Sequence, residues 1–217
     1  MRLTWIGQTC FYIESHDGRS LLIDPFQRVI GLPRGDLPAD VVVFSHTHID
    51  HYDPGAVAPQ ASIVMGPGQH SVAGFRIFGV QAYHDAKEGL LCGEVTIYGI
   101  SVDGFRIVHL SDIGEEPDDA RLQAIGKPDV LLFPAGQHTT IDLRQAARLI
   151  DRLKPAIAIP MAFHLPGLLM PSTGLDEVKR TFLKHRCANR LELAPGTRLA
   201  RQTEIRILDA VAYCGAK

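Results

Sequence analysis

The residues best able to do chemistry lie together in one nine-residue stretch, 45–53, which reads SHTHIDHYD. Its candidate metal ligands are three histidines and an aspartate: His46, His48, Asp50 and His51. Imidazole and carboxylate groups are the ligands that zinc and similar divalent metals accept. Two histidines separated by one residue in a loop can point toward one ion, and the Asp-His pair that follows can turn toward a second. The stretch therefore predicts a site for up to two neighbouring metal ions.

A buried strand is expected to position this stretch. The apolar run 41–44 is short and rich in β-branched residues, as a buried strand would be, and Pro54-Gly55 closes the segment. The ligands would then lie at the carboxyl end of that strand. Asp112 follows another predicted strand, 105–110, and a carboxylate there can bridge two ions because each oxygen can bind one.

The sequence resembles a known family at these residues. HTHIDH is similar to the HxHxDH signature of metallo-β-lactamase-fold hydrolases. LTWIGQTCFYIE near the start, LLIDP and AYHD resemble the family's small single-domain bacterial members, which are described as zinc-dependent hydrolases. The resemblance runs from about residue 3 to about residue 170. It implies an α/β fold, the four-layer αββα sandwich, with the metal site along one edge, but it implies no particular substrate.

The resemblance also implies a ligand set. The first metal would be held by three histidines, His46, His48 and His84. The second would be held by Asp50, His51 and Asp112. Asp24 ends a predicted strand, and the resemblance places it beneath the ligands, where a carboxylate fixes the tautomer of a histidine. A simple turn-forming role for Asp24 is the alternative.

One position departs from the family. Related chains end a later strand with Ile-Pro-Met-His, whereas this chain reads IPMAFH over 159–164, so Ala162 stands at the expected ligand position. A methyl group cannot bind a metal. His164 lies two residues on, about 6–7 Å further along an extended segment, and a bend before Pro166 could return it. We treat His164 as a candidate fourth ligand of the second metal, which should bind weakly without it.

The expected chemistry is hydrolysis. Two divalent ions about 3.5–4 Å apart lower the pKa of a shared water to near neutrality, and the hydroxide attacks an ester, lactone, amide or phosphodiester centre. Asp50 is the expected catalytic carboxylate, which orients this water. His138, after a second buried strand, could donate to a developing oxyanion, or it could be a surface histidine. A small ester-like or phosphoester molecule is the expected substrate.

Two other classes of function remain open. The same fold can hold iron for redox chemistry, although glutamate ligands would favour iron and no carboxylate replaces a histidine here. A metal-binding protein that has lost catalysis is the second alternative. The expected cofactor is zinc, with manganese or iron as alternatives.

The composition of the sequence limits the kinds of partner and the location that we expect for the protein. With 46% apolar and 21% charged residues and no linker, residues 1–217 are expected to form one soluble domain. A net charge of −2 offers no basic surface for nucleic acid. No apolar run reaches the roughly 20 residues of a membrane span, and the first residues lack a signal-peptide core. The four cysteines show no CxxC spacing, so we expect free thiols and a cytoplasmic location. The oligomeric state cannot be read from the sequence.

Several further elements are expected. Asp17-Gly18 and Asp103-Gly104 predict tight hairpin turns. Helices are predicted at 120–125, after Asp142, and at 175–185, and the tail from 191 to 212 should add strands. The last helix should bury Val178, Phe182 and Leu183. DVLLF at 129–133 repeats the pattern of DVVVF at 40–44, which suggests two related halves. His109 is interpreted as structural, and the acidic run 115–119 as a helix start.

Overall fold

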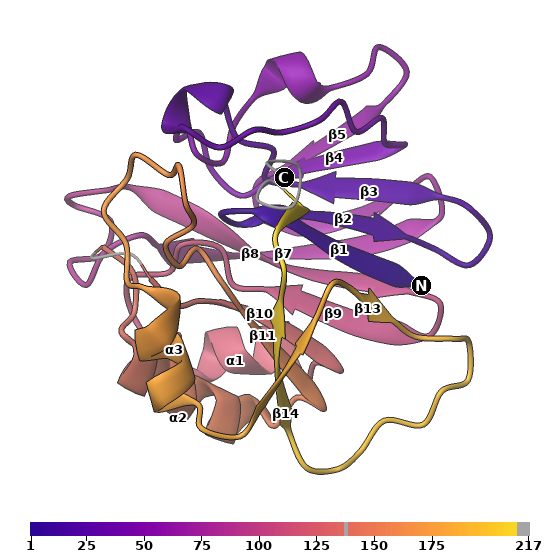
Figure 1. Cartoon of the computed structure of the whole chain (residues 1–217). Helices are drawn as coiled ribbons and strands as arrows, with labels where there is room; N and C mark the ends of the chain where they lie inside the picture. Colours follow the sequence, from indigo (N-terminus) through magenta and orange to yellow (C-terminus); the bar gives the residue numbers. More distant parts are fainter. Residues whose placement is uncertain (137–138, 212–217) are drawn as a thin grey trace.

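Short apolar and β-branched runs of the sequence form the strands of two sheets that lie face to face (Figure 1). This computed structural model describes residues 1–136 and 139–211. The strands of the first sheet are Arg2–Gly7 (β1), Cys10–Glu14 (β2), Ser20–Ile23 (β3), Val41–Phe44 (β4), Ser62–Met65 (β5) and Leu191–Glu192 (β13). They lie in the order β13-β1-β2-β3-β4-β5.

The second sheet is larger and contains eight strands. They are Gly68–Val72 (β6), Phe75–Tyr83 (β7), Glu94–Val102 (β8), Phe105–His109 (β9), Val130–Pro134 (β10), Ile157–Met161 (β11), His185–Ala188 (β12) and Glu204–Leu208 (β14). Their order is β12-β14-β11-β10-β9-β8-β7-β6. Both sheets contain parallel and antiparallel pairs, so each combines hairpins with longer crossovers.

Aromatic side chains fill the space between the sheets. The Trp5 ring centroid lies 6.4 Å from that of Phe11 and 4.8 Å from that of Phe163. Phe11 in β2 meets the ring of His109 in β9 edge-on at 6.1 Å, which joins the two sheets. All four side chains are buried, so this aromatic group lies in the core directly behind the sheet edge that carries the candidate ligands.

Three helices cover the outer face of the second sheet, at the lower left of Figure 1. They are Asp119–Ile125 (α1), Leu143–Leu153 (α2) and Leu175–Thr181 (α3). Asp118 caps α1, as the acidic run predicted, and Asp142 forms a capping box with Gln145 at the start of α2. Within the described residues, no helix is long and apolar enough to cross a bilayer.

An irregular segment, 24–40, covers the outer face of the first sheet. Tyr12 alternates with the inward-facing Phe11, and its hydroxyl donates to the Pro38 carbonyl oxygen at 2.8 Å. Leu22 and Val42 are in register with Tyr12 and fully buried, so the segment shields this face. Its regular structure is one short 3₁₀ turn, Arg28–Ile30 (η1). The expected α/β sandwich is confirmed, with helices forming one outer layer and this segment forming much of the other.

The two sheets contain a structural repeat. Strands β1 to β5 and β7 to β11 have the same spatial order and the same sequence of antiparallel and parallel pairings. Asp40 accepts a hydrogen bond from the Ser20 backbone N–H at 2.7 Å, and Asp129 accepts one from the Arg106 backbone N–H at 2.8 Å. The related halves suggested by DVVVF and DVLLF are therefore seen in the fold. Strands β1, β3, β4, β7, β9, β10 and β11 consequently end at one edge of the sandwich.

Of the two predicted hairpin turns, the one at Asp103-Gly104 has the expected tight geometry and the one at Asp17-Gly18 does not. Asp103 and Gly104 both have left-handed φ angles, 51° and 85°, and join β8 to β9 as predicted. At the first hairpin only Gly18 is left-handed, and the loop is longer because the Ser15 N–H donates to the Arg19 carbonyl oxygen. Strand β6 and the turn that joins it to β7 were not predicted.

The predicted helix 175–185 is too long. Helix α3 ends at Thr181, and Phe182 leaves the helical conformation to pack on Phe133, with ring centroids 5.5 Å apart. The chain then continues into β12, which pairs with β14. Leu183 was predicted to face inward and is 81% exposed. Strand pairing and aromatic packing therefore override the helical pattern here.

Candidate metal centre

The predicted ligands converge at the edge of the sandwich where parallel strands end. His46 follows β4, His84 follows β7 and Asp112 follows β9, so two sheets contribute to one site. Two groups of side chains place their ligand atoms within 4.8 Å of one another. The first is His46, His48 and His84, and the second is His46, His51 and Asp112.

The first group consists of three imidazoles. The ring centroid of His46 lies 4.6 Å from that of His48 and 5.1 Å from that of His84, and His48 and His84 are 5.0 Å apart. His46 and His84 are buried, whereas His48 is exposed. The first group is thus open to solvent on the side of His48, where a substrate could approach.

The second group is more deeply buried and richer in oxygen. The Nε2 atom of His51 lies 3.0 Å from Oδ2 of Asp112 and 3.2 Å from Oδ2 of Asp50. The same oxygen of Asp112 lies 3.6 Å from Nε2 of His84, so this carboxylate stands between the two groups. That position is the one expected of a carboxylate that bridges two ions.

Two polar residues fix the orientation of His51. Its Nδ1 atom lies 2.8 Å from the Thr9 hydroxyl and 3.3 Å from Oδ2 of Asp24. Asp24 is itself held by the backbone N–H and hydroxyl of Ser45, each at 2.7 Å. With Nδ1 engaged on this side, Nε2 faces the ligand group. Asp24 therefore lies beneath the ligands, as the sequence resemblance implied.

The histidines of the site differ in the direction in which their pKa values are shifted. Burial, together with the nearby His51 and His84 rings, lowers the pKa of His46, and burial and His84 lower that of His48. Both are therefore neutral at pH 7 and can donate a lone pair to a metal. Burial would also lower the pKa of His51, but Asp112 and Asp50 outweigh it and raise that pKa well above its usual value. A metal must therefore displace a proton from His51.

Asp50 remains ionised in this buried site. Burial alone would raise the pKa of its carboxyl group, but the positive charge of His51 and hydrogen bonds from His51 and Gln8 lower it overall. Asp50 can consequently act as a hydrogen-bond acceptor or as a metal ligand throughout the neutral pH range.

The site contains buried acceptors that fit a divalent cation. Within the described residues, His46 Nε2 and Asp112 Oδ1 are buried and lack a hydrogen-bond partner. Leaving such atoms unpaired is costly, so native sites rarely do so without another group present. Three imidazoles in one group, and two imidazoles with the Asp112 carboxylate in the other, are the donors that zinc and similar metals accept. The residues present therefore fit the expected metal.

Within the described residues, His164 is not among these groups. His164 is exposed, and its Nδ1 atom lies 3.5 Å from the Ser172 hydroxyl. Ala162 adopts a left-handed φ of 60°, and Phe163 turns inward against Trp5, which leaves the His164 side chain at the surface. His138 lies outside the described residues.

Replacing His164 with alanine is therefore expected to leave metal binding unchanged. The exposed imidazole is not part of either ligand group, so the metal content per chain and the affinity of each equivalent should match the parent. Titration of the metal-free variant and parent with zinc checks this expectation. A loss of the second equivalent in the variant alone would show that His164 reaches the centre in solution.

The sequence did not reveal two polar residues of the site. Gln8 and Thr9 form the tight turn between β1 and β2, where Gln8 Nε2 donates to Oδ2 of Asp50 at 3.0 Å. Both side chains are fully buried. The available signal was the placement of Gln-Thr directly after the apolar run LTWIG, at the end of a strand that runs to the site edge. His109, by contrast, is structural as predicted, since its Nε2 atom bonds the Thr9 carbonyl oxygen at 2.9 Å.

The chain is similar to known proteins in both sequence and structure. Residues 2–162 match the beta-lactamase superfamily domain. A UPF0173 metal-dependent hydrolase from Methanoculleus marisnigri is 26% identical over 90% of this chain and 95% of its own length. A proposed Zn-dependent hydrolase of the metallo-β-lactamase superfamily from Thermotoga maritima is similar in structure. Its TM-score is 0.76 at 27% identity, covering 96% of this chain and 98% of that one.

A second similar structure is a metallo hydrolase from Ignicoccus hospitalis, with a TM-score of 0.61 and 25% identity. It covers 82% of this chain and 88% of its own. The matched domain spans most of the sequence and includes His46, His48, His84 and Asp112. The chain therefore belongs to the metallo-β-lactamase superfamily of metal-dependent hydrolases.

Proposed function

We propose that this protein hydrolyses a small, uncharged ester or lactone that carries an apolar substituent. The observation that carries the proposal is the pair of adjoining ligand groups with buried, unpartnered acceptor atoms. The first group, His46, His48 and His84, would hold one divalent ion, and His51 and Asp112, beside Asp50, would hold a second. When bound, such ions supply Lewis acidity that polarises a carbonyl group and acidifies water.

Zinc is the proposed metal of the first group, since three neutral imidazoles match its preferred donors. Manganese and iron remain alternatives for the group that contains carboxylates.

The protein's own contribution centres on Asp50. Its ionised carboxylate, fixed by Gln8 and His51, would orient the attacking water by accepting a hydrogen bond from it. His138 follows β10 in the sequence and is the proposed donor to the developing oxyanion. A histidine there would stabilise charge that forms in the transition state.

Exposed apolar side chains lie on four segments that follow strands ending at the site edge. We name them the apolar rim: Val29, Ile49, Leu90, Leu91 and Leu169, which are 52–80% exposed. Their segments follow β3, β4, β7 and β11, whose carboxyl ends share the site edge. The Gln27 N–H donates to the Ile49 carbonyl oxygen, and the Leu169 N–H donates to that of Ile30, so three of these segments are joined. Large exposed apolar patches commonly mark binding sites.

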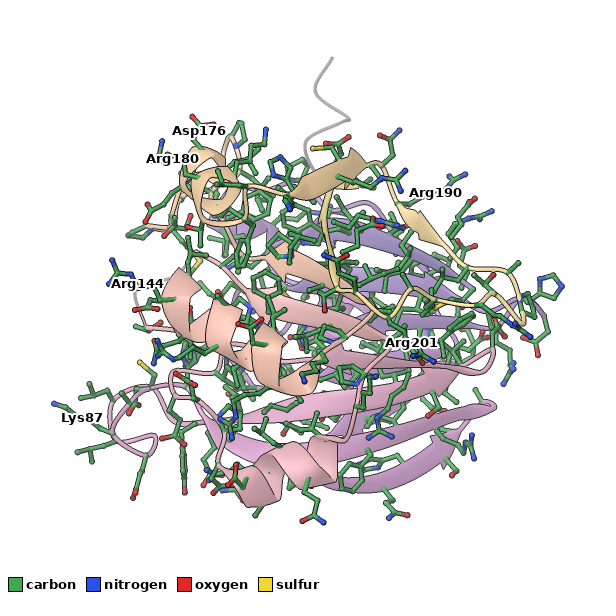
Figure 2. The ribbon with its side chains drawn as sticks, turned by 90° about the horizontal axis from the view of Figure 1, so that it is seen from below. Lys87, Arg144, Asp176, Arg180, Arg190 and Arg201 are labelled. Atoms are coloured by element: carbon green, nitrogen blue, oxygen red, sulfur yellow. The ribbon has the colours of Figure 1, made fainter. Side chains whose placement is uncertain are left out.

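The rim offers little positive charge to an anionic substrate. Arg28 is paired with Asp36, and Arg34 is buried against Asp53. Figure 2 shows Lys87 directed outward from the loop that carries Leu90 and Leu91. Residues 165–170 contain no charged side chain. Because recognition of a phosphate group usually relies on Arg or Lys, the rim favours an uncharged apolar ester over a phosphodiester.

Hydrolysis of p-nitrophenyl esters by the zinc-loaded protein is expected to rise with acyl chain length. Each methylene that contacts the rim should raise kcat/KM by about twofold, roughly half the effect of complete burial. Leu169→Ser should flatten this dependence, whereas Leu183→Ser should preserve it. Leu169 and Leu183 are similarly exposed, at 76% and 81%, but Leu183 lies beyond the end of α3.

The same assay includes bis(p-nitrophenyl) phosphate. A parent enzyme that prefers this diester, or that shows no chain-length dependence among the esters, would contradict the proposed substrate class.

A further inference from the structure

Gln8 is held in an unusual conformation beside the metal centre. It has a left-handed φ of 51°, which is uncommon for a residue with a side chain, and it is fully buried. Its carbonyl oxygen accepts hydrogen bonds from the Trp5 indole at 2.8 Å and from the Ala162 N–H at 3.0 Å. Contacts from β1 and from the end of β11 therefore fix the backbone that carries this amide.

The two ends of the Gln8 amide have different surroundings. Nε2 donates to Oδ2 of Asp50 at 3.0 Å, whereas Oε1 is buried and has no hydrogen-bond partner in the part of the chain that the structure describes. Exchanging the two atoms would turn Oε1 toward a carboxylate oxygen, and two acceptors repel. The hydrogen-bonding pattern thus sets the orientation and leaves an acceptor oxygen within the site.

The second ligand group adjoins the Gln8 amide through Asp50. Oδ2 of Asp50, which Gln8 contacts, lies 3.2 Å from Nε2 of His51, and that nitrogen lies 3.0 Å from Asp112. Ala162, whose backbone bonds Gln8, offers no ligand atom, and His164 is directed to the surface. Amide carbonyl oxygens are established ligands of divalent cations. A cation at this group would pair with Oε1 of Gln8, which no other group among the described residues satisfies.

We propose that Gln8 is a metal ligand, binding through Oε1 a divalent cation held by His51 and Asp112, while its Nε2 fixes Asp50. This inference rests on the metal centre of the proposed function. It makes the second site rich in oxygen ligands, which suit manganese, while the three imidazoles of the first site suit zinc. The protein should therefore bind one Zn²⁺ tightly and then one Mn²⁺ at the site that includes Gln8.

Metal titration of the chelator-treated, full-length protein tests the assignment. The parent, loaded with one equivalent of Zn²⁺, should bind one further Mn²⁺, counted by electron paramagnetic resonance. Gln8→Met has a similar volume but no oxygen ligand, and its affinity for this Mn²⁺ should fall at least tenfold while the tight Zn²⁺ equivalent is kept. Gln27→Met is the control, because Gln27 Nε2 bonds the Tyr52 carbonyl oxygen outside the ligand groups, and it should bind both ions.

Gln8→Glu separates ligation from the positioning of Asp50. Glutamate keeps an oxygen ligand but cannot donate to Asp50, so it should retain the Mn²⁺ if Gln8 is a ligand. Loss of Mn²⁺ from this variant, full binding by Gln8→Met, or a parent that binds a single ion would each overturn the proposal. If Gln8→Met does not fold, Gln8→Asn replaces it in the titration. Its amide is one methylene too short to reach the cation, so its affinity for Mn²⁺ should also fall, and full Mn²⁺ binding would overturn the proposal. A parent that binds no metal would instead overturn the proposed function.

Discussion

Replacing Asp50 with asparagine is expected to lower kcat/KM about 10²–10³-fold on whichever ester the parent hydrolyses, with little change in folding. The amide has nearly the same shape, but it lacks the negative charge that would orient water. Because this charge acts mainly in the transition state, kcat should carry most of the loss. Steady-state kinetics of the metal-loaded variant measure it, and the zinc content should stay at the parent's value in the first group.

Asp36→Asn is the matched control for this variant. Asp36 is an exposed carboxylate on the segment 24–40, paired with Arg28 at 3.2 Å, so its loss should leave the rate unchanged. If Asp50→Asn keeps activity within a few-fold of the parent at full metal content, Asp50 does not have the catalytic role assigned to it.

Replacing His48 with alanine is expected to abolish tight metal binding at the first group. His48 is exposed, so in the metal-free protein its removal should change the free energy of unfolding little. With zinc at about a thousandfold excess over its Kd, the parent should gain about 4 kcal/mol, and most of this gain should disappear in the variant. Urea unfolding with and without zinc separates the two contributions.

His16→Ala provides the comparison for His48→Ala. His16 is exposed and lies at the β2–β3 hairpin, away from both ligand groups, so the variant should keep the full zinc-dependent gain. Equal zinc-dependent stabilisation of the parent and His48→Ala would rule out His48 as a ligand.

Most of the sheet framework could be predicted because its signals are local. Buried strands such as β4 and β10 are short apolar runs, and the turn at Asp103-Gly104 depends on residues that tolerate left-handed φ. Predictions failed where contacts between residues far apart in the sequence determine the local structure. Helix α3 ends early because Phe182 packs on Phe133, a contact that no window around residue 182 contains.

The residues of the candidate site also differ in whether the local sequence was enough to predict them. His46, His48 and His51 share one short stretch, so spacing alone brought them together. His84 and Asp112 were identified by resemblance and by their places at strand ends, and the structure brings them to the same edge.

Gln8 and His164 show why the remainder was not predictable. Glutamine is a rare metal ligand, and Gln8 differs from an ordinary turn residue in tertiary features: its hydrogen bond to Asp50 and a buried Oε1 that has no partner among the described residues. The orientation of His164 depends on the left-handed φ of Ala162 and the burial of Phe163. The amino-acid sequence of this segment is compatible both with a bend that turns His164 toward the site and with a bend that turns it away.

The dependence of hydrolysis on bound metal tests the central claim most directly. The protein is stripped with a chelator, assayed on a medium-chain p-nitrophenyl ester, and assayed again after stepwise addition of zinc, with bound metal measured by elemental analysis. The account predicts negligible activity without metal and a rate that rises in proportion to the zinc held by the first group, until that group is filled. Ester hydrolysis that persists in the stripped protein, or in a His46→Ala, His48→Ala double variant, would contradict it.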